Sequence, residues 1–222
     1  SIQHSTIHDP NQKNPKIEMS PIVQRVLDSN PLLEAFGNAK TSRNDNSSRF
    51  GKYLQLQFDA EDPRLAAYAG KKLPSCVLAG SKCEVYLLEK SRVIAHEENE
   101  RAYHIFYQLL AAKKKEKKEI WDELEDCNNE SFSYVGYTDL NKIEGKTDGE
   151  RFGLTKAALA LVGVSGDAFI TLMRTICVVL QLGNLTFGPD DSGEGSVIES
   201  EDELESLCDL MGIDGPNMTL AL

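Results

Sequence analysis

The stretch Asn44-Asp45-Asn46-Ser47-Ser48-Arg49-Phe50-Gly51-Lys52 decides how this chain of 222 residues is interpreted. It gathers side-chain amides, two hydroxyls and an arginine on one loop, immediately before a strand-like run. A serine hydroxyl suits Mg²⁺, amides and backbone N–H groups bind phosphate oxygens, and arginine forms bidentate bridges to carboxylates. These groups are what a loop needs to sense a terminal phosphate and its metal ion. On composition alone such a loop is most often an ordinary turn, so the surrounding sequence has to decide.

The segment before this loop predicts a polar start and then a helix. Residues 1–20 are polar without hydrophobic periodicity, which indicates a variable surface loop or a ragged start. Ser20 and Pro21 form a favourable helix start, and apolar residues then recur with the helical period as far as Leu33. Residues 37–49 are dense in Gly, Asn and Ser, which favours ordered turns.

Two strands are expected after the loop. Lys52–Asp59 alternates apolar and polar side chains, which predicts a half-buried strand. Cys83–Leu88 predicts a second strand, and residues 60–73 between the two are polar and charged.

From Asn99 onward the pattern becomes helical, with an apolar face formed by Ala102, Ile105, Phe106, Leu109 and Leu110. The charged run Lys113–Lys118 is expected to be a solvated end of that helix. Residues 127–150 are loop-rich.

Further helices are predicted over Ala157–Leu161 and Ala168–Leu182, and Gly183 is expected to end the second of them. Leu185–Phe187 is short and extended, and a surface loop follows at Gly188–Ser196. A last amphipathic helix is marked by Leu204, Leu207, Cys208 and Met211.

Composition excludes several classes of function. The formal net charge is −11, so the chain as a whole has no electrostatic attraction to nucleic acid. The 5 cysteines show no CxxC or Cys/His spacing of a zinc site, which favours a reducing, cytosolic compartment. Cys177 and Cys208 fall on apolar stripes, where cysteine behaves as a small hydrophobe. No run of about 18 apolar residues predicts a transmembrane segment.

Several longer motifs point to one family. Leu32–Thr41 (LLEAFGNAKT) followed by Asn44–Lys52 (NDNSSRFGK) closely resembles the myosin motif NPxLEAFGNAKTxRNxNSSRFGK, which is switch I with its preceding helix. Tyr86–Val93 (YLLEKSRV) and Glu100–Leu110 (ERAYHIFYQLL) resemble two further myosin segments, with Ala102 in place of the usual Asn. Leu182–Phe187 (LGNLTF) resembles the family's LGNIxF. The resemblance covers residues 20–222 in family order.

The resemblance implies an α/β, P-loop-NTPase-like myosin motor, incomplete in this chain and mainly α-helical. Residues 21–222 would then be part of one motor domain, with switch I at residues 44–52 and central-sheet strands at about 52–59 and 83–93. A helical upper subdomain facing actin would cover about 99–222.

The resemblance also implies roles for individual residues. Asn44, Asn46, Ser47 and Ser48 would bind the nucleotide of ATP, Ser48 would ligate Mg²⁺, and Ser47 would contact the γ-phosphate and the attacking water. Arg49, paired with Ser47 as a catalytic residue, would bridge to a glutamate on switch II.

The implied parent protein is a cytoplasmic, actin-based motor of the cytoskeleton that hydrolyses ATP. Its partners would be the actin filament and, through regions outside this chain, light chains or calmodulin, with no nucleic acid. The family places the phosphate loop upstream and switch II downstream of these residues, so the isolated chain is expected to be inactive.

Two other interpretations remain. A myosin-like scaffold would bind actin or nucleotide without cycling, although a dead motor would be free to lose the intact Asn44–Arg49 motif. A kinesin would show Ser-Ser-Arg followed by Ser-His, whereas Phe50 and Gly51 follow here.

Overall fold

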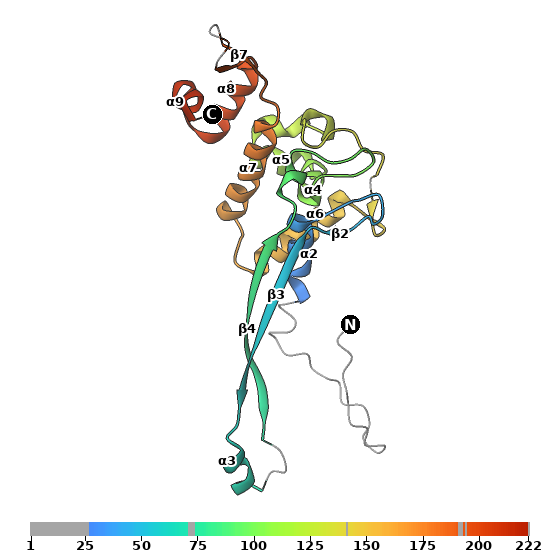
Figure 1. Ribbon diagram of the computed structural model, residues 1–222, viewed down its shortest axis with the longest axis vertical. Coiled ribbons are helices and arrows are strands. Elements are labelled where there is room, and N and C mark those ends of the chain that lie inside the picture. The colour runs from blue at the N-terminus through green and yellow to red at the C-terminus, as the bar shows by residue number, and fades with distance from the viewer. Residues whose placement is uncertain (1–26, 71–73, 141, 191–192, 194, 222) are drawn as a thin grey trace.

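The computed structural model describes residues 27–70, 74–140, 142–190, 193 and 195–221, and the predicted helix start at Ser20 and Pro21 lies outside them. Figure 1 shows a helical body from which a long two-stranded ribbon, β3–β4, projects, with α3 at its far tip. The helix α7 leads to a smaller group formed by β7, α8 and α9 at the opposite end of the body.

The first half of the described chain contains α2 (Asn30–Gly37), β1 (Asn38–Ala39), β2 (Ser47–Ser48), β3 (Phe50–Ala60), α3 (Pro63–Tyr68), β4 (Cys76–Leu87) and the 3₁₀ turn η1 (Lys90–Val93). The second half contains α4 (His104–Leu110), α5 (Lys114–Ile120), η2 (Asp122–Asp126), η3 (Asn129–Ser131), β5 (Lys142–Ile143), β6 (Lys146–Thr147), α6 (Asp148–Leu161), α7 (Asp167–Leu182), β7 (Phe187–Pro189), β8 (Ser196–Ile198), α8 (Glu201–Met211) and α9 (Gly215–Ala221).

The core of the body is built around α4. Every residue of this helix is buried: Ile105, Phe106 and Leu109 are apolar, and the polar His104 and Gln108 hydrogen-bond to Asn46 and Thr155. It packs against α2, α6 and α7, which contribute Ala35, Phe152, Phe169 and Met173 to the same hydrophobic cluster. Because α2 leads into the segment that contains residues 44–52, that segment starts from a helix packed directly on α4.

The two predicted strands are confirmed as neighbours, but their extents and burial differ from expectation. β3 and β4 pair antiparallel from Phe50 opposite Leu87 to Ala60 opposite Cys76, with a register shift between Gln57 and Phe58. The second strand therefore begins before Cys83 and ends at Leu87 instead of continuing to Val93. Residues Lys90–Val93 form a 3₁₀ turn instead, whose Arg92 is buried.

The predicted half-burial of the first strand is wrong for the described residues. Leu54 is only partly covered, and Leu56 and Phe58 are 46% and 57% exposed. The alternation correctly predicts the strand, but the ribbon leaves the body (Figure 1), and the described residues supply no layer to cover it.

Two helix predictions need correction at their boundaries. The helix expected from Asn99 onward is α4, which begins at His104. The helix expected over Ala157–Leu161 is α6, which begins earlier, at Asp148, because Thr147 and Glu150 form a capping box there. The run Lys113–Lys118 does not extend α4 but lies mostly in a separate helix, α5.

Lys117 also departs from the solvated face expected for its run. It is buried, and its Nζ donates a hydrogen bond to the backbone oxygen of Cys127 at 2.7 Å. A carbonyl that caps the ammonium makes this burial tolerable.

The two later helices agree with the sequence, whereas both ends of the predicted surface loop Gly188–Ser196 lie in the paired strands β7 and β8. α7 ends at Leu182 with Gly183 as its C-cap, and α8 buries Leu207 and Cys208, although Met211 is exposed. Cys177 is fully buried, and burial raises the pKa of its thiol to about 12. All five cysteines are free.

Candidate functional site

The loop Thr41–Arg49 stands on a two-stranded stem. β1 and β2 pair antiparallel, with Asn38 opposite Ser48 and Ala39 opposite Ser47. The backbone N–H of Arg49 also donates to the oxygen of Gly37 at 2.7 Å, which extends the stem towards α2. The loop therefore returns to its starting point before it continues directly into β3.

Asn44 shapes the interior of the loop. The backbone N–H of Thr41 donates to the backbone oxygen of Asn44 at 2.8 Å, and the N–H of Asn44 donates back to Thr41 Oγ1 at 3.1 Å. Asn44 Oδ1 accepts the N–H of Asn46 at 2.8 Å, an Asx turn. The side chain is exposed, and its Nδ2 group makes no hydrogen bond with the residues that the structure describes. Asn44 therefore orders the turn while keeping donors that face no protein partner.

Asn46 ties the loop to the body. Its Oδ1 accepts hydrogen bonds from Asn38 Nδ2 at 2.9 Å and from His104 Nε2 at 3.1 Å. Its Nδ2 donates to Glu34 Oε2 at 3.2 Å, and the same carboxylate oxygen accepts from Arg151 at 3.4 Å. This amide is engaged by α2, β1 and α4, so its geometry fits the positioning of the loop better than a direct phosphate contact.

The next residues, Ser47, Ser48 and Arg49, are those expected from the sequence to contact the γ-phosphate, Mg²⁺ and a switch II carboxylate. Ser47 Oγ accepts a hydrogen bond from Arg49 Nη1 at 3.3 Å. Ser48 is exposed, and its hydroxyl donates to the backbone oxygen of Phe50 at 3.0 Å. Because the proton of Ser48 is used in that bond, its oxygen lone pairs remain available to a cation.

Arg49 joins a chain of alternating charges. Its Nε contacts Glu89 Oε2 at 2.5 Å, and the same oxygen accepts from Arg92 Nε at 2.8 Å. Arg92 also binds Glu100 at 2.9 Å, and Glu100 accepts the backbone N–H of Ser42 at 2.9 Å. The Arg92 guanidinium, assisted by Arg49, holds the pKa of Glu89 below its usual range. Both ends of the loop are thus fastened to one network.

Burial differs along this network. The side chains of Arg92 and Glu100 are 6% and 10% exposed, whereas those of Arg49 and Glu89 are 31% and 27% exposed. The inner part is therefore fixed in the body, and the outer arginine is accessible to solvent.

A metal site made by this chain alone is not evident. Among the described residues no group of three or more His, Cys, Asp or Glu side chains is arranged to hold a metal ion. Ser48 offers one hard oxygen of the kind Mg²⁺ prefers, so the loop fits a single-ligand contribution to a shared site.

The sequence did not predict that Glu34 and Glu100 contact the loop. Glu34 lies in α2, 12 residues before its partner Asn46, and Glu100 lies in the segment before α4, 58 residues after its partner Ser42. Only the arrangement of those segments around the loop brings them together. Glu89 and Arg92 form an ion pair beside the loop, and His104 forms a hydrogen bond with Asn46 in it.

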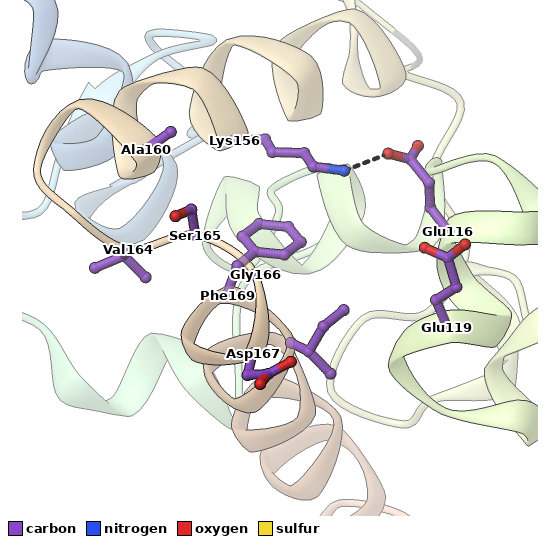
Figure 2. A pocket seen from close by; sticks show the side chains of 10 residues that line it. Glu116, Glu119, Lys156, Ala160, Val164, Ser165, Gly166, Asp167 and Phe169 are labelled. Carbon is purple, nitrogen blue, oxygen red and sulfur yellow. Dashed lines mark hydrogen bonds and ion pairs between the residues drawn. The ribbon is translucent and has the colours of Figure 1, made fainter.

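A cavity of about 320 Å³ lies elsewhere, between α5, α6 and the start of α7. Figure 2 shows Lys156 reaching across it to Glu116, at 2.7 Å, with the Phe169 ring beneath, 5.1 Å from the ammonium. No residue of the loop Thr41–Arg49 lines this cavity, so it is separate from the candidate site.

Comparison with known proteins identifies the family. The family described as Myosin head (motor domain) matches residues 4–222. The chain belongs to the myosin motor-domain family. The resemblance seen in the switch I motif and the later segments is thereby confirmed.

Several myosins are similar over most of this chain. Myosin-2 of Lachancea kluyveri is 37% identical over 215 residues, which cover 96% of this chain and 13% of that protein. Myosin IA heavy chain of Dictyostelium discoideum is 39% identical, covering 89% of this chain and 18% of its own length. Unconventional myosin-Va of Rattus norvegicus is 39% identical, covering 89% and 10% respectively. The chain thus spans under a fifth of these myosins.

One further feature of this myosin chain concerns membranes. Within the part of the chain that the structure describes, none of the helices is both long enough and apolar enough to cross a bilayer.

Proposed function

We propose that this chain is part of an actin-based motor ATPase and supplies the loop that senses the γ-phosphate and Mg²⁺. The observation that carries the proposal is the attachment of the loop. Its start and end are both held by the Glu89–Arg92–Glu100 network, and its last residue leads directly into β3. A change at the phosphate end of such a loop is passed to a strand and to the body without a flexible joint between them.

Each loop residue has a role in this proposal. Asn44 donates its side-chain amide to phosphate oxygens, and Ser47 contacts the γ-phosphate and orients the attacking water. Ser48 ligates Mg²⁺ through its hydroxyl oxygen. Asn46 acts on the nucleotide mainly by holding the loop against α4. Arg49 closes the site by bridging to a carboxylate of another segment of the motor.

The cofactors follow from the donors available. Amides and backbone N–H groups suit phosphate oxygens, and the hydroxyl oxygen of Ser48 would contribute one ligand to an Mg²⁺ ion. When bound, Mg²⁺ neutralises charge on the phosphates.

The exposed ribbon supports a place in a larger sheet. Leu56, Phe58 and Val77 are between 46% and 64% exposed, an unusual amount for alternating apolar strands. We propose that β3 and β4 belong to the central twisted sheet of a P-loop-NTPase-like motor, whose other parts cover these side chains. The helical region from about residue 99 would then form the upper subdomain that faces actin.

The remaining partners follow from the family. Actin is the filament partner, and light chains or calmodulin bind regions outside this chain. The proposed location is the actin cytoskeleton of the cytoplasm.

A comparison of two arginine variants tests the proposal. In the intact motor, Arg49→Ala should still bind ATP but hydrolyse it about a hundredfold more slowly or worse in a single turnover, because the bridge across the site is lost. Arg43→Ala removes an exposed arginine of the same loop and should hydrolyse ATP normally. Near-normal hydrolysis by Arg49→Ala would refute the assignment. An intact wild-type motor that binds actin or ATP without turnover would instead support the scaffold.

A further inference from the structure

The carboxylate of Glu89 is shared by two arginines. Arg49 Nε and Arg92 Nε contact the same oxygen, Oε2, at 2.5 and 2.8 Å. One carboxylate therefore joins an arginine of the loop to an arginine of the body.

Arg92 is more buried than Arg49 and has more hydrogen-bond partners. Arg92 is buried and has further partners in Glu100 Oε2, at 2.9 Å, and the backbone oxygen of Arg101, at 3.2 Å. Arg49 is about a third exposed, and its other side-chain contact is Ser47 Oγ, at 3.3 Å. Arg49 can therefore leave Glu89 towards solvent without breaking the buried part of the network.

Glu89 itself stays in place when Arg49 leaves. Its backbone oxygen accepts the hydroxyl of Tyr103 at 2.5 Å, and Arg92, three residues along the 3₁₀ turn, continues to compensate its charge. A carboxylate that keeps one arginine does not become an unpaired charge, so the second arginine can be released at modest cost.

We propose that Glu89 is the resting partner of Arg49, and that this carboxylate sets how readily Arg49 is released to bridge across the nucleotide site. The proposal rests on the proposed function of Arg49. Glu89 and the carboxylate of the other segment compete for one guanidinium, so the Arg49–Glu89 pair favours the open loop. Arg92 is the positioning residue that keeps Glu89 within reach of Arg49.

The consequence is a shift in a two-state equilibrium. A partly exposed ion pair has a modest effect, so loss of the Glu89 charge should favour the closed loop roughly two- to fivefold. Mutation of a merely structural residue would lower stability without raising the population of the closed state.

The experiment uses the intact motor with ATP and Mg²⁺ and measures the ratio of bound products to bound ATP after a single-turnover acid quench. Glu89→Gln keeps the size of the side chain and should raise this ratio roughly two- to fivefold, the range for one partly exposed pair. Glu89→Asp keeps the charge beside Arg92 but withdraws it from Arg49, and should raise the ratio by less. Glu84→Gln is the matched control, because this half-exposed glutamate of β4 pairs with Lys82 and not with Arg49 or Arg92, and it should leave the ratio unchanged.

Coupling to Arg49 separates the two proposals. In the Arg49→Ala background, Glu89→Gln should have no further effect on the ratio, because the competing guanidinium is gone. A Glu89→Gln ratio equal to or below that of the wild type, in a protein with an unchanged melting temperature, would overturn the inference. If Glu89→Gln lowers the melting temperature, Glu89→Asp tests the inference in its place. A ratio of bound products to bound ATP above that of the wild type supports the inference, and a ratio at or below it overturns the inference. Normal hydrolysis by Arg49→Ala would refute the proposed function instead.

Discussion

His104 donates its Nε2–H to the side-chain oxygen of Asn46 over 3.1 Å, and this hydrogen bond joins the buried helix α4 to the candidate phosphate-sensing loop. An amide oxygen only accepts, so the proton of the neutral ring must lie on Nε2. The other ring nitrogen, Nδ1, is buried without a hydrogen-bond partner among the described residues. A second proton would therefore create a buried, unpaired donor and charge.

The histidine makes stability depend on pH in the acid range. Burial, with help from Arg101 and Arg151, lowers the pKa of His104 from 6.5 to about 3. The unfolded chain binds a proton between these two values and the native protein does not, so acid favours unfolding. From pH 7 to pH 5 we expect His104 to remove about 2 kcal/mol of stability.

The measurement is the melting temperature of the intact motor against pH for the wild type and His104→Gln. The glutamine cannot titrate, so the gap between the two proteins should narrow as the pH falls from 7 to 5. His96→Gln, at a half-exposed position, is the control and should follow the wild type. A gap that stays constant over this range would show that His104 does not titrate with a lowered pKa.

The ion pair between Arg101 and Asp148 holds the segment before α4 to the start of α6. Arg101 Nη2 lies 2.9 and 3.0 Å from the two carboxylate oxygens, and the side chains are 0% and 9% exposed. Asp148→Ala leaves a buried guanidinium without its charge partner, which should cost about 3–5 kcal/mol in the free energy of unfolding. Denaturant unfolding of the motor measures this loss.

Asp126→Ala breaks a solvent-exposed pair with Lys114 and serves as the comparison. We expect little effect from it, because exposed ion pairs contribute little to stability. Equal midpoints for the two alanine variants would mean that water reaches Arg101 and compensates the loss.

Gly37 lies where α2 meets the stem of the loop, and the ring of Phe50 occupies the space beside it. A Cβ at this position would lie 2.3 Å from Phe50 Cδ1. Gly37→Ala should therefore displace the first residue of β3 and lower the stability of the motor by about 1–3 kcal/mol. It should also speed amide hydrogen exchange in the loop Thr41–Arg49.

Gly51→Ala tests whether space alone explains that effect, because a Cβ at Gly51 would meet nothing within 4 Å. This control should exchange at wild-type rates in the loop. Phe50→Leu combined with Gly37→Ala should recover part of the loss, since the smaller side chain leaves room. No recovery in the double variant would contradict the steric explanation.

Ser48 is the residue whose removal should affect the metal without affecting the loop's attachment. Its backbone pairs with Asn38 in the stem, but its hydroxyl bonds only the oxygen of Phe50 among the described residues. In Ser48→Ala the Mg²⁺ concentration that retains nucleotide should rise about tenfold or more, because a methyl group cannot ligate the ion. Nucleotide release from the motor is measured across an Mg²⁺ titration.

Ser81→Ala removes an exposed hydroxyl from β4 and should leave that titration unchanged. If Ser48→Ala also gives an unchanged titration, Ser48 is not a ligand of the metal.

The sequence by itself determined the family and most of the elements. The run from Leu32 to Lys52 is long enough to identify myosin, and the period of the apolar residues predicts β3, α7 and α8. These are local properties, because backbone preferences and side-chain periodicity act within a few residues. The loop was placed for the same reason, since its Asn and Ser residues form turns with their own backbone.

Only the tertiary structure decided what each loop side chain faces. Asn46 and Ser48 are both polar residues of one loop, yet the first is held by Asn38, Glu34 and His104 while the second stays exposed. The pairing of Arg49 with Glu89 and the burial of Lys117 also depend on segments that meet only after folding. Local sequence cannot encode such outcomes, because they depend on which elements meet: the pairing of β3 with β4 brings Arg49 to Glu89, and the packing of α5 on η2 covers Lys117.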